Sequence, residues 1–424
     1  MIDPMGLNLR HLDTLAVAAR LGTLSAASKE LNLSQPAVTQ AVASLEAQLR
    51  HTLLERQVTG VRPTRAGSQL IARVHRAVAY LERGGQALRR SARLPALPHI
   101  SRRVTLNQLR ALLAVDEAGS FALASARTQL SQPALHRSAR ELEEQLGVPL
   151  LTRQGRTVVK TPAAAHFLRY VSLVRAELEA GVDELEALRS QGGGRLRIGT
   201  MPVAQAVLLP QSLARFARSY GDAHVNIVEG PYPELLSSLR HGELDILVGA
   251  LRDPLPVSDV TQEGVFSDDP VIVARSGHPL ARRPFGFEKL LEYPWVISAS
   301  GTPGRRRWEE MFTSHGFEPP KLRIECGSLL VIRGLMLEGD WLTLLSPDQF
   351  LFEARAGLLT RLDEPGLKLR RRLGITTRSD WRPTELQAAF VETFREVCRE
   401  WGAEKTSEYQ PFRYGEGGAI QLGE

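Results

Sequence analysis

The strongest constraint in this sequence is an internal repeat. The segment "LSQPAVTQAVASLEAQL" (Leu33–Leu49) returns as "LSQPALHRSARELEEQL" (Leu130–Leu146). A shift of 97 positions aligns Leu7–Gly67 with Val104–Ala164 without a gap, and roughly a third of the aligned residues are identical. This period is longer than the roughly 20 to 50 residues of solenoid repeats. The repeat therefore predicts a duplicated domain rather than an array.

Local signals predict three helices in each copy. In the first copy, apolar spacing predicts a helix over Leu9–Leu21 and a short one over Ser25–Leu31. Ser34 is a good N-cap, and Pro36 is tolerated in a first helical turn because the N–H that it lacks has no partner there. A third helix is therefore expected to begin at Gln35.

This third helix has one apolar face and one polar face. Residues at i, i+4, i+7 and i+11 form the apolar stripe that we expect to be buried: Val38, Val42, Leu45 and Leu49. The opposite face carries short side chains: Gln35, Thr39, Gln40, Ala43 and Ser44. Gln can bond the adenine edge in two places, and a Thr methyl can contact a thymine methyl. The pattern favours a helix-turn-helix whose third helix enters a DNA groove; the alternative is an ordinary helical bundle with a solvated face.

The segment after this helix and the charge distribution both favour a polyanion partner. "LLERQVTGVRPTRAG" (Leu53–Gly67) predicts a two-stranded wing rich in Arg, suited to contact with phosphates. Residues 1–103 carry 15 Lys and Arg against 6 Asp and Glu, residues 104–190 carry 10 against 10, and the remainder carries 28 against 31. The basic excess lies in the first segment, where neutralising phosphates would release counterions. The alternative for the charge is a merely solvated surface.

The combination of "AASKELNLSQPAVTQAVASLEAQL", "LLER" and "PTRAG" resembles the winged helix-turn-helix of LysR-type transcriptional regulators. In that family the recognition helix begins at a Ser/Thr-Gln-Pro-Ala stretch, which corresponds here to residues 34–37. Family members usually have one such domain, whereas this chain has two. The resemblance and the polar face together give the candidate DNA-binding residues of the first copy: Ser34, Gln35, Pro36, Thr39, Gln40, Arg56, Arg62 and Arg65.

The second copy departs from the first on its outward face. It places His136, Arg137, Arg140 and Glu141 where the first copy has Thr39, Gln40, Ala43 and Ser44, and its wing ends at Ala164 instead of a Gly. Its candidate DNA-binding residues are Ser131, Gln132, Pro133, His136, Arg137 and Arg153. We expect unequal roles, in which the first copy recognises sequence and the second adds weaker contact or sets the geometry.

A long helix is expected after each wing, because the family dimerises through one. The second of these helices has a nearly heptad-like apolar stripe from Phe167 to Leu188 with acidic neighbours. It suits contact with protein rather than DNA. We expect this stripe to be the main contact of a homo-oligomer, a dimer or a tetramer.

These features divide the chain into five segments. A first winged helix-turn-helix with its helix occupies residues 7–93, a basic Pro-containing linker 94–103, a second winged helix-turn-helix with the dimerisation helix 104–190, an effector-binding domain 195–401 and a tail 402–424. Between the copies, Ser91–Arg103 should be extended. "SQGGG" (Ser190–Gly194) predicts a flexible hinge.

The C-terminal half is predicted to be an α/β domain. Five short apolar strands, "LRIGT", "VNIVE", "DILVG", "PVIVA" and "WVISA", alternate with helical segments, which favours largely parallel sheets. "RLRIGTMPVAQAVLLPQSLARFARSY" resembles the effector domain of LysR-type regulators. That resemblance implies two Rossmann-like lobes, as in periplasmic binding proteins, with an inducer cleft between them. It also implies that "LGITTR" and a helix around Leu386–Cys398 complete the first lobe.

Ligands of open α/β sheets bind beyond the carboxyl ends of strands, where helix N-termini offer N–H groups. Four such places give the candidate effector-binding residues: Thr200, Met201, Pro202, Gly230, Pro231, Tyr232, Ser298, Ser300, Gly301, Thr302, Gly327 and Ser328. We expect a carboxylate or another small anion, while an ordinary helix cap is the alternative at any single place. Arg305, Arg306 and Arg307 are expected to be mostly solvated.

Other classes of function lack a motif. The ten histidines show no metal spacing, the two cysteines form no disulfide framework, and no nucleophile elbow stands out, so we expect no metal, no cofactor and no catalysis. No apolar run approaches a membrane span and no secretion signal is visible, so a cytoplasmic protein is expected.

The leading hypothesis is a LysR-type transcriptional regulator whose partners are double-stranded DNA, a small-molecule inducer, RNA polymerase and further copies of the chain. The alternative is a solute-binding protein or an enzyme built on the α/β domain.

Overall fold

The structure, a computed structural model, describes residues 2–189, 192–282, 284–362 and 370–408. It divides into two compact units. Among the described residues, the first contains 2–189, 192–199, 217–247 and 377–388, and the second contains 200–216, 248–282, 284–362, 370–376 and 389–408. Both copies of the repeat therefore lie in the first unit.

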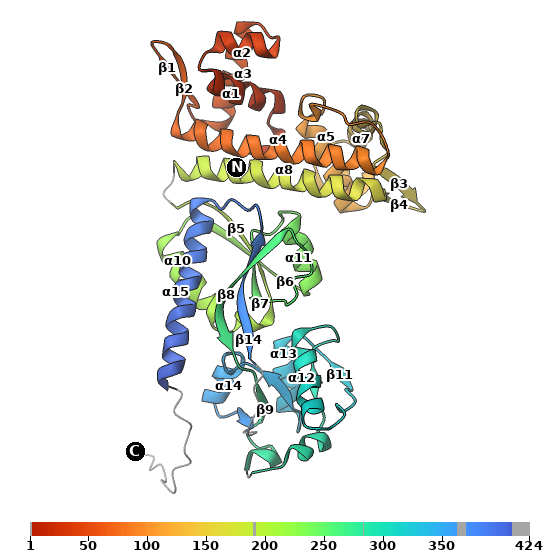
Figure 1. The fold of residues 1–424 in the computed structure, drawn as a ribbon, viewed down its shortest axis with the longest axis vertical. Helices are drawn as coiled ribbons and strands as arrows, with labels where there is room; N and C mark the ends of the chain where they lie inside the picture. The colour runs from red at the N-terminus through yellow and green to blue at the C-terminus, as the bar shows by residue number, and fades with distance from the viewer. Residues whose placement is uncertain (1, 190–191, 283, 363–369, 409–424) are drawn as a thin grey trace. The chain divides into compact units, whose positions relative to one another are not determined.

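Each copy folds into three helices and a hairpin (Figure 1). In the first copy these are α1 (Leu9–Leu21), α2 (Leu24–Leu31), α3 (Gln35–Leu49), β1 (Leu54–Gln57) and β2 (Gly60–Pro63). In the second they are α5 (Leu106–Ala118), α6 (Phe121–Arg127), α7 (Gln132–Leu146), β3 (Leu151–Gln154) and β4 (Thr157–Lys160). The predicted start of the third helix is confirmed, because Ser34 caps α3 and Ser131 caps α7.

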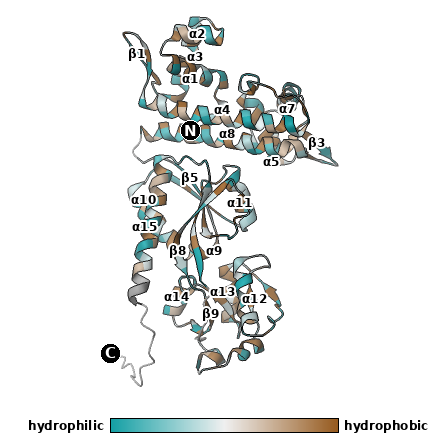
Figure 2. Ribbon diagram, viewed as in Figure 1, coloured by the Kyte–Doolittle hydropathy of each residue, from teal (hydrophilic) through white to brown (hydrophobic). Residues whose placement is uncertain are grey.

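A long helix follows each hairpin, α4 (Arg65–Ser91) and α8 (Pro162–Ala187). The two helices lie side by side and antiparallel, because Arg73 contacts Glu184 near the end of α8 while Gly84 lies against Tyr170 near its start (Figure 1). Hydrophobic residues recur along both helices (Figure 2).

The apolar stripe of α8 is buried within the chain. Six of its seven residues are each at most 1% exposed, namely Phe167, Val171, Val174, Leu178, Val182 and Leu185, and Leu188 is half-buried. They belong to one hydrophobic cluster with residues of α4. The expectation that this stripe forms the main contact of a homo-oligomer is therefore wrong, because helix α4, from the first copy of the repeat in the same chain, already covers it.

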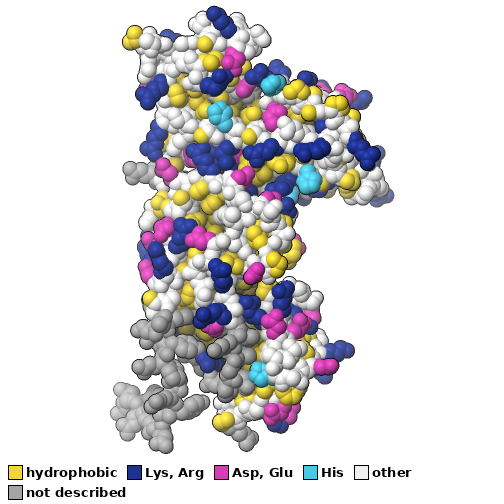
Figure 3. Space-filling model, in the orientation of Figure 1, with side chains coloured by type: hydrophobic (Ala, Val, Ile, Leu, Met, Phe, Trp, Pro, Cys, Tyr) yellow, Lys and Arg dark blue, Asp and Glu magenta, His cyan; other side chains and the backbone are white. Residues whose placement is uncertain are grey.

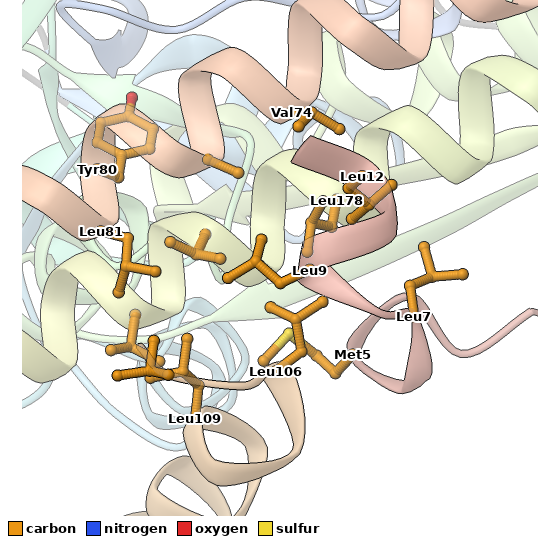
Figure 4. Packing of buried hydrophobic residues seen from close by; sticks show 14 of the residues in the cluster. Met5, Leu7, Leu9, Leu12, Val74, Tyr80, Leu81, Leu106, Leu109 and Leu178 are labelled. Carbon is orange, nitrogen blue, oxygen red and sulfur yellow. The ribbon is translucent and has the colours of Figure 1, made fainter. Parts of the chain in front are cut away.

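The two copies share one large core, and each keeps a small cluster of its own, around Val38 in the first copy and around Leu135 in the second. Leu12 of α1, Leu109 of α5, Val74 and Leu178 belong to the same cluster (Figure 4). Two 3-10 helices complete it, η1 (Pro4–Gly6) and η2 (Ile100–Arg102), and Ile100 is fully buried. The segment 94–103 is thus no free linker, and the packed region begins before residue 7.

The C-terminal half contains the expected alternation of strands and helices. Its larger sheet has the strand order β6-β5-β7-β14-β8. The strands are β5 (Gly194–Thr200), β6 (Ala223–Glu229), β7 (Ile246–Ala250), β8 (Val260–Asp268) and β14 (Arg371–Arg378), and the helices are α9 (Pro202–Gln205), α10 (Leu208–Ser219), α11 (Tyr232–Arg240) and α15 (Glu385–Glu408). Helix α15 passes the expected domain end at 401. Residues 409–424 of the expected tail and residues 190–191 of the expected hinge lie outside the described residues.

A smaller sheet lies in the second unit. It consists of β12 (Thr343–Leu345), β9 (Val271–Arg275) and β13 (Leu359–Leu362), and beside it β10 (Val296–Ile297) pairs with β11 (Ile324–Glu325). The flanking helices are η3 (Pro279–Arg282), η4 (Phe287–Glu292), α12 (Pro303–Ser314), α13 (Leu329–Leu337), η5 (Pro347–Phe350) and α14 (Leu351–Arg355).

Pairing directions in this second-unit sheet differ from the prediction. Both neighbours of β9 run antiparallel to it, so the expectation of largely parallel sheets is wrong here. An apolar pattern marks a strand, but the connections between strands set the direction of pairing. Among the described residues, no helix combines the length and the apolar character that a membrane span needs.

Candidate nucleic-acid interface and effector region

The third helix of the first copy presents the polar face that its sequence predicts. Val38 and Leu45 are fully buried under it, whereas the outward positions are exposed: Ser34, Gln35, Pro36, Thr39, Gln40 and Ala43. Only Ser44 of the predicted face is half-buried. The exposed face is uncharged and made of short amide, hydroxyl and methyl groups. Such groups can contact base edges in a major groove.

Hydrogen bonds fix two hydroxyls of this helix. Ser34 Oγ accepts from the N–H of Ala37 at 3.3 Å, which orients the first turn. Thr39 Oγ1 donates to the carbonyl oxygen of Gln35 at 3.0 Å. Because the O–H donor of that hydroxyl is used within the helix, the groups left for a partner are the acceptor oxygen and the methyl of Thr39, and a thymine methyl suits the latter.

Two contacts attach the wing to the rest of the first copy. Glu46 Oε1 on α3 accepts from the N–H groups of Leu53 and Leu54, at 2.7 and 3.2 Å. At the other end, the N–H of Val61 donates to the carbonyl oxygen of Gly22 at 2.7 Å. The wing is therefore held at a fixed place beside the recognition helix.

The second copy repeats both attachments. Glu143 Oε1 accepts from Leu150 and Leu151, at 2.7 and 3.0 Å, and the N–H of Val158 donates to the carbonyl oxygen of Gly119. Sequence reasoning assigned no role to Glu46 or Glu143. Their identity at a spacing of 97 residues was the available signal.

The predicted phosphate contacts of the first copy differ in their surroundings. Arg56 and Arg62 are exposed on β1 and β2. Glu55 stands directly opposite Arg62 in the hairpin, so Arg56 and Arg62 lie on opposite faces of it. Arg65 begins α4 and forms an exposed ion pair with Glu385 at 3.0 Å. A phosphate would compete with Glu385 for this guanidinium.

The outward face of α7 in the second copy is charged, and some of its side chains contact one another or neighbouring residues. Gln132, Pro133, His136, Arg137 and Arg153 are exposed as predicted, and so is the N-cap Ser131. The ring of His136 stacks on Phe121 with centroids 3.6 Å apart. Arg140 pairs with Glu144 at 3.1 Å. Both contacts therefore engage side chains of this face within the second copy itself.

A hollow of about 690 Å³ lies between α7 and the wing of the second copy. Its lining includes His136, Arg137, Arg153, Glu141 and Glu144. The equivalent positions of the last two in the first copy are Ser44 and Ala47. Carboxylates at this place repel phosphates, so the two copies differ in charge as well as in shape.

Two of the four expected effector-binding places come together in the second unit. Strands β10 and β11 are parallel neighbours, in the register Val296 with Ile324. The segments that follow them, Ser298–Thr302 and Gly327–Ser328, therefore lie at the same sheet edge. Ser300, Gly301, Gly327 and Ser328 are exposed there.

Helix caps use part of this edge. Thr302 Oγ1 accepts from the N–H of Arg305 at 3.2 Å and lies 2.7 Å from Ser298 Oγ, so it is the cap of α12. The Ser328 side chain makes no capping bond to α13. Among these hydroxyls, that of Ser328 is the better placed to meet a ligand.

The place after β5 is less open than its sequence suggests. Thr200 is 1% exposed and Met201 is 9% exposed, and the N–H of Met201 donates to the carbonyl oxygen of Val248 at 3.1 Å. Met201 also covers Gly249, where a Cβ would lie 2.3 Å from Met201 Cε. Only Pro202 is partly open in this group. The expected backbone donor at Met201 is thus already used.

The fourth place, Gly230 to Tyr232, belongs to the first unit and precedes α11. Pro231 is exposed, while Gly230 and Tyr232 are half-buried.

The three arginines that follow Thr302 differ in exposure and in their partners. Arg305 bonds Glu309 and Glu325 and lies 5.0 Å from the centre of the Trp308 ring, whereas Arg306 is exposed.

Burial controls the charge state of two titratable groups in the second unit, Cys398 and His278. No cluster of three or more His, Cys, Asp or Glu side chains could hold a metal ion in the described part of the chain. Burial raises the pKa of the Cys398 thiol to about 12, which makes it inert near neutral pH. Burial lowers the pKa of His278, which keeps this fully buried imidazole neutral.

Comparison with protein families matches both halves of the chain. The family described as "Bacterial regulatory helix-turn-helix protein, lysR family" matches residues 9–68 and again residues 106–165. The family described as "LysR substrate binding domain" matches residues 189–399.

Individual relatives agree with these matches. The HTH-type transcriptional regulator GalR of Pseudomonas putida is 29% identical over 400 residues, which are 94% of this chain and 100% of that protein. A probable nitrogen assimilation transcriptional activator of Synechococcus elongatus is 30% identical over 303 residues, 70% of this chain and 94% of that protein. The crystal structure of CbnR, a LysR family transcriptional regulator, has a TM-score of 0.51 at 20% identity, covering 69% of this chain and 98% of that one, and this likeness concerns the fold alone.

Proposed function

We propose, since the chain belongs to the LysR family of bacterial transcriptional regulators, that its first copy of the repeat recognises the bases of an operator while its second copy adds weaker DNA contact. The chain is a transcriptional regulator with a C-terminal effector-binding domain, and the relatives favour this reading over the alternative of a solute-binding protein or an enzyme. The observation that carries the proposal is the exposed, uncharged face of α3 beside a wing with Arg56 and Arg62.

The proposed roles follow from side-chain chemistry. Gln35 and Gln40 would each pair with an adenine edge, and Thr39 would contact a thymine methyl, a good bidentate pair being worth about 1–3 kcal/mol of discrimination. Arg56 and Arg62 would bind phosphates, and Arg65 would do so by leaving Glu385. Phosphate contacts fix position but carry no base information.

Two observations support a second helix-turn-helix in the same chain. The Pseudomonas putida relative leaves 6% of this chain unmatched, less than one copy occupies, and the helix-turn-helix family matches twice. In the proposed second head, Gln132, His136, Arg137 and Arg153 would contact DNA, with Glu141 limiting the affinity.

For the effector we propose a small molecule with a carboxylate or another anionic group. The support is that Ser298–Thr302 and Gly327–Ser328 follow neighbouring parallel strands and begin α12 and α13, because the first turn of a helix offers backbone N–H groups to an anion. Thermal unfolding of the full chain with a panel of small carboxylates tests this. Stabilisation of the chain that Ser328→Val abolishes, while Ser314→Val keeps it, is the expected result; stabilisation unaffected by Ser328→Val would place the ligand elsewhere.

We further propose that the regulator acts in the cytoplasm on double-stranded DNA, contacts RNA polymerase there and forms homo-oligomers without using the buried stripe of α8. No resident cofactor or metal enters this proposal. The support is family membership, because bacterial transcription takes place where the DNA and the polymerase are.

The deciding experiment is selection of binding sites from a random duplex library with the full chain. Gln35→Ala should flatten the base preference at one position, and Gln132→Ala, its equivalent in the second copy, should have a smaller effect. Arg56→Ala should weaken binding to every sequence and reduce its salt dependence. If Gln35→Ala kept the wild-type preference, the recognition face would be wrongly assigned.

A further inference from the structure

The contact between α4 and α8 has the symmetry of a homodimer but is made of unlike residues. In the sequence, a shift of 97 positions aligns Gly84 with Gly181 and Arg73 with Tyr170. In the structure, a Cβ on Gly84 would lie 2.7 Å from Tyr170, and a Cβ on Gly181 would lie 3.3 Å from Arg73. Each glycine thus receives the side chain at the equivalent position of the other copy.

One half of this contact is a buried charge cluster. Arg73 is 1% exposed and bonds Glu177 and Glu184, whose side chains are 7% and 8% exposed. Burial by itself would lower the pKa of Arg73, but the two carboxylates raise it above its usual value. The guanidinium is therefore charged and fully compensated.

The other half of the contact has no charge pair. The positions equivalent to Arg73 and Glu177 are Tyr170 and Tyr80, whose rings are 6.3 Å apart, and the position equivalent to Glu184 is Ala87. The charge cluster therefore exists only when α4 faces α8.

Pairing between identical helices would break the cluster. Two α4 helices in the same arrangement would bury two Arg73 guanidinium groups opposite Tyr80 and Ala87. Two α8 helices would bury four carboxylates opposite Tyr170. A buried charge without its partner is strongly destabilising, so the sequence selects the pair of unlike helices.

Two ion pairs next to the helix-turn-helix domains, which we call the heads, also favour the pairing of unlike copies. Asp13 and Arg110 occupy equivalent positions with opposite signs. Asp13 pairs with Arg102 at 3.3 Å, and Arg110 pairs with Asp3. Each pair joins an acid from residues 3–13 to an arginine from residues 102–110. Such half-exposed pairs contribute little energy alone, but their signs agree with the buried cluster.

We propose that one chain assembles the complete pair of DNA-binding heads in cis and that its operator consists of two unlike half-sites, one for each copy. This rests on the proposed function of the first copy. Because α4 and α8 are antiparallel, the heads attach at opposite ends of the pair. Helix α4 has 27 residues, or roughly 40 Å, which is close to the 34–36 Å spacing of half-sites on one face of DNA.

The chemistry of the two faces predicts how the half-sites differ. Gln35, Thr39 and Gln40 suit a half-site rich in A·T pairs. The exposed Arg137 suits a guanine, because a guanidinium bonds the O6 and N7 atoms of guanine in two places. The partner is thus an asymmetric duplex, and a palindrome of either half-site would be a poorer ligand.

Lys and Arg side chains also form a row at the level of the long helices (Figure 3).

A complementation experiment with full-length chains tests assembly in cis. One variant carries Gln35→Ala and Gln40→Ala, and a second carries His136→Ala and Arg137→Ala, all at exposed positions. The probe is a duplex selected by the wild-type chain, and the measurement is fluorescence anisotropy of each variant alone and after co-expression of both. We expect each variant to bind at least tenfold more weakly and the co-expressed mixture to bind no better.

The outcomes separate the two proposals. Wild-type affinity of the mixture would overturn assembly in cis, because heads from different chains would then form a working pair. Wild-type affinity of the second variant alone would overturn the use of two heads while leaving the first copy as the reader. Wild-type affinity of the first variant alone would overturn the proposed function itself.

A second arm tests the asymmetry of the site. Duplexes that repeat either half-site as a palindrome, at unchanged spacing, should bind the wild-type chain at least tenfold more weakly than the selected duplex. Equal or tighter binding to a palindrome would overturn the assignment of unlike half-sites.

Discussion

Replacing Arg73 by Met should loosen the helix pair that joins the two copies. The Arg73 guanidinium donates to Glu177 and Glu184 at 3.1 Å and to the carbonyl oxygen of Arg382 at 2.9 Å. After the replacement, Glu177 keeps Arg76 at 2.9 Å. Glu184, at 8% side-chain exposure, keeps no cation within ion-pair distance in the described part of the chain.

The expected cost follows from that stranded carboxylate. Removing one partner of a buried ion pair costs about 3–5 kcal/mol. Because tenfold corresponds to about 1.4 kcal/mol, hydrogen exchange of the α4 and α8 amides should accelerate by roughly 100-fold to several thousand-fold, up to the limit set by global unfolding. Exchange followed by mass spectrometry on peptides of α4 and α8 measures this locally, which matters in a chain with two units.

Two variants make this measurement decisive. Arg90→Met, at an exposed position of the same helix, should leave exchange nearly unchanged. Adding Glu184→Leu to Arg73→Met should restore most of the protection, because an apolar replacement of a buried ion pair is often close to neutral. The reasoning fails if Arg73→Met behaves like Arg90→Met, or if the double variant exchanges as fast as the single one.

Four further variants probe the two wings, a buried acid and the helix contact. Glu46→Ala and Glu143→Ala each remove the acceptor of two backbone N–H groups, so each should weaken its own hairpin by about 1–3 kcal/mol; exchange that stays slow in that hairpin would contradict this. Burial raises the pKa of Asp183 from 3.8 to about 6, so the wild-type chain should lose stability relative to Asp183→Asn as the pH rises from 4 to 6. The difference, at most about 3 kcal/mol, is measured by urea unfolding at pH 4 and 7, and a pH-independent difference would refute it. Gly84→Ala puts a methyl 2.7 Å from Tyr170 Cβ and should cost about 1–3 kcal/mol in thermal unfolding. The cost should be smaller in a Tyr170→Gly background, which lacks that Cβ; an equal cost in both backgrounds would locate the clash elsewhere.

Local signals in the sequence predicted the DNA-binding elements well. Ser34 followed by Gln35 and Pro36 fixes the start of α3 through a cap and a tolerated proline, both of which act within four residues. The burial of Val38 and Leu45 follows from helical spacing in the same way. The exposed face of α3 could therefore be identified without knowledge of the rest of the chain.

Features that depend on distant residues could not be predicted in this way. Helical spacing predicts that the apolar stripe of α8 is buried. It does not identify the helix that covers the stripe, because a helix of the same chain and a helix of a second protein molecule were both physically possible. The hydrogen bond from the N–H of Met201 to the carbonyl oxygen of Val248 also depends on distant residues. The sequence predicts an N–H at the end of the strand, but whether that N–H is bonded depends on which strand packs beside it. Likewise the antiparallel partners of β9 depend on connections many residues long.

The glycine pair Gly84 and Gly181 lies between these two cases. Their spacing of 97 residues is visible in the sequence, and glycine inside a long helix costs roughly 1 kcal/mol relative to alanine, so both positions call for a packing reason. The reason is the close approach of the other helix, which needs the identity of Tyr170 and Arg73 as well as their place in space. Because the two copies of the repeat pair with each other through α4 and α8, the difference between Arg73 and its equivalent Tyr170 has a physical role. It makes the two copies complementary to each other and each of them a poor partner for itself.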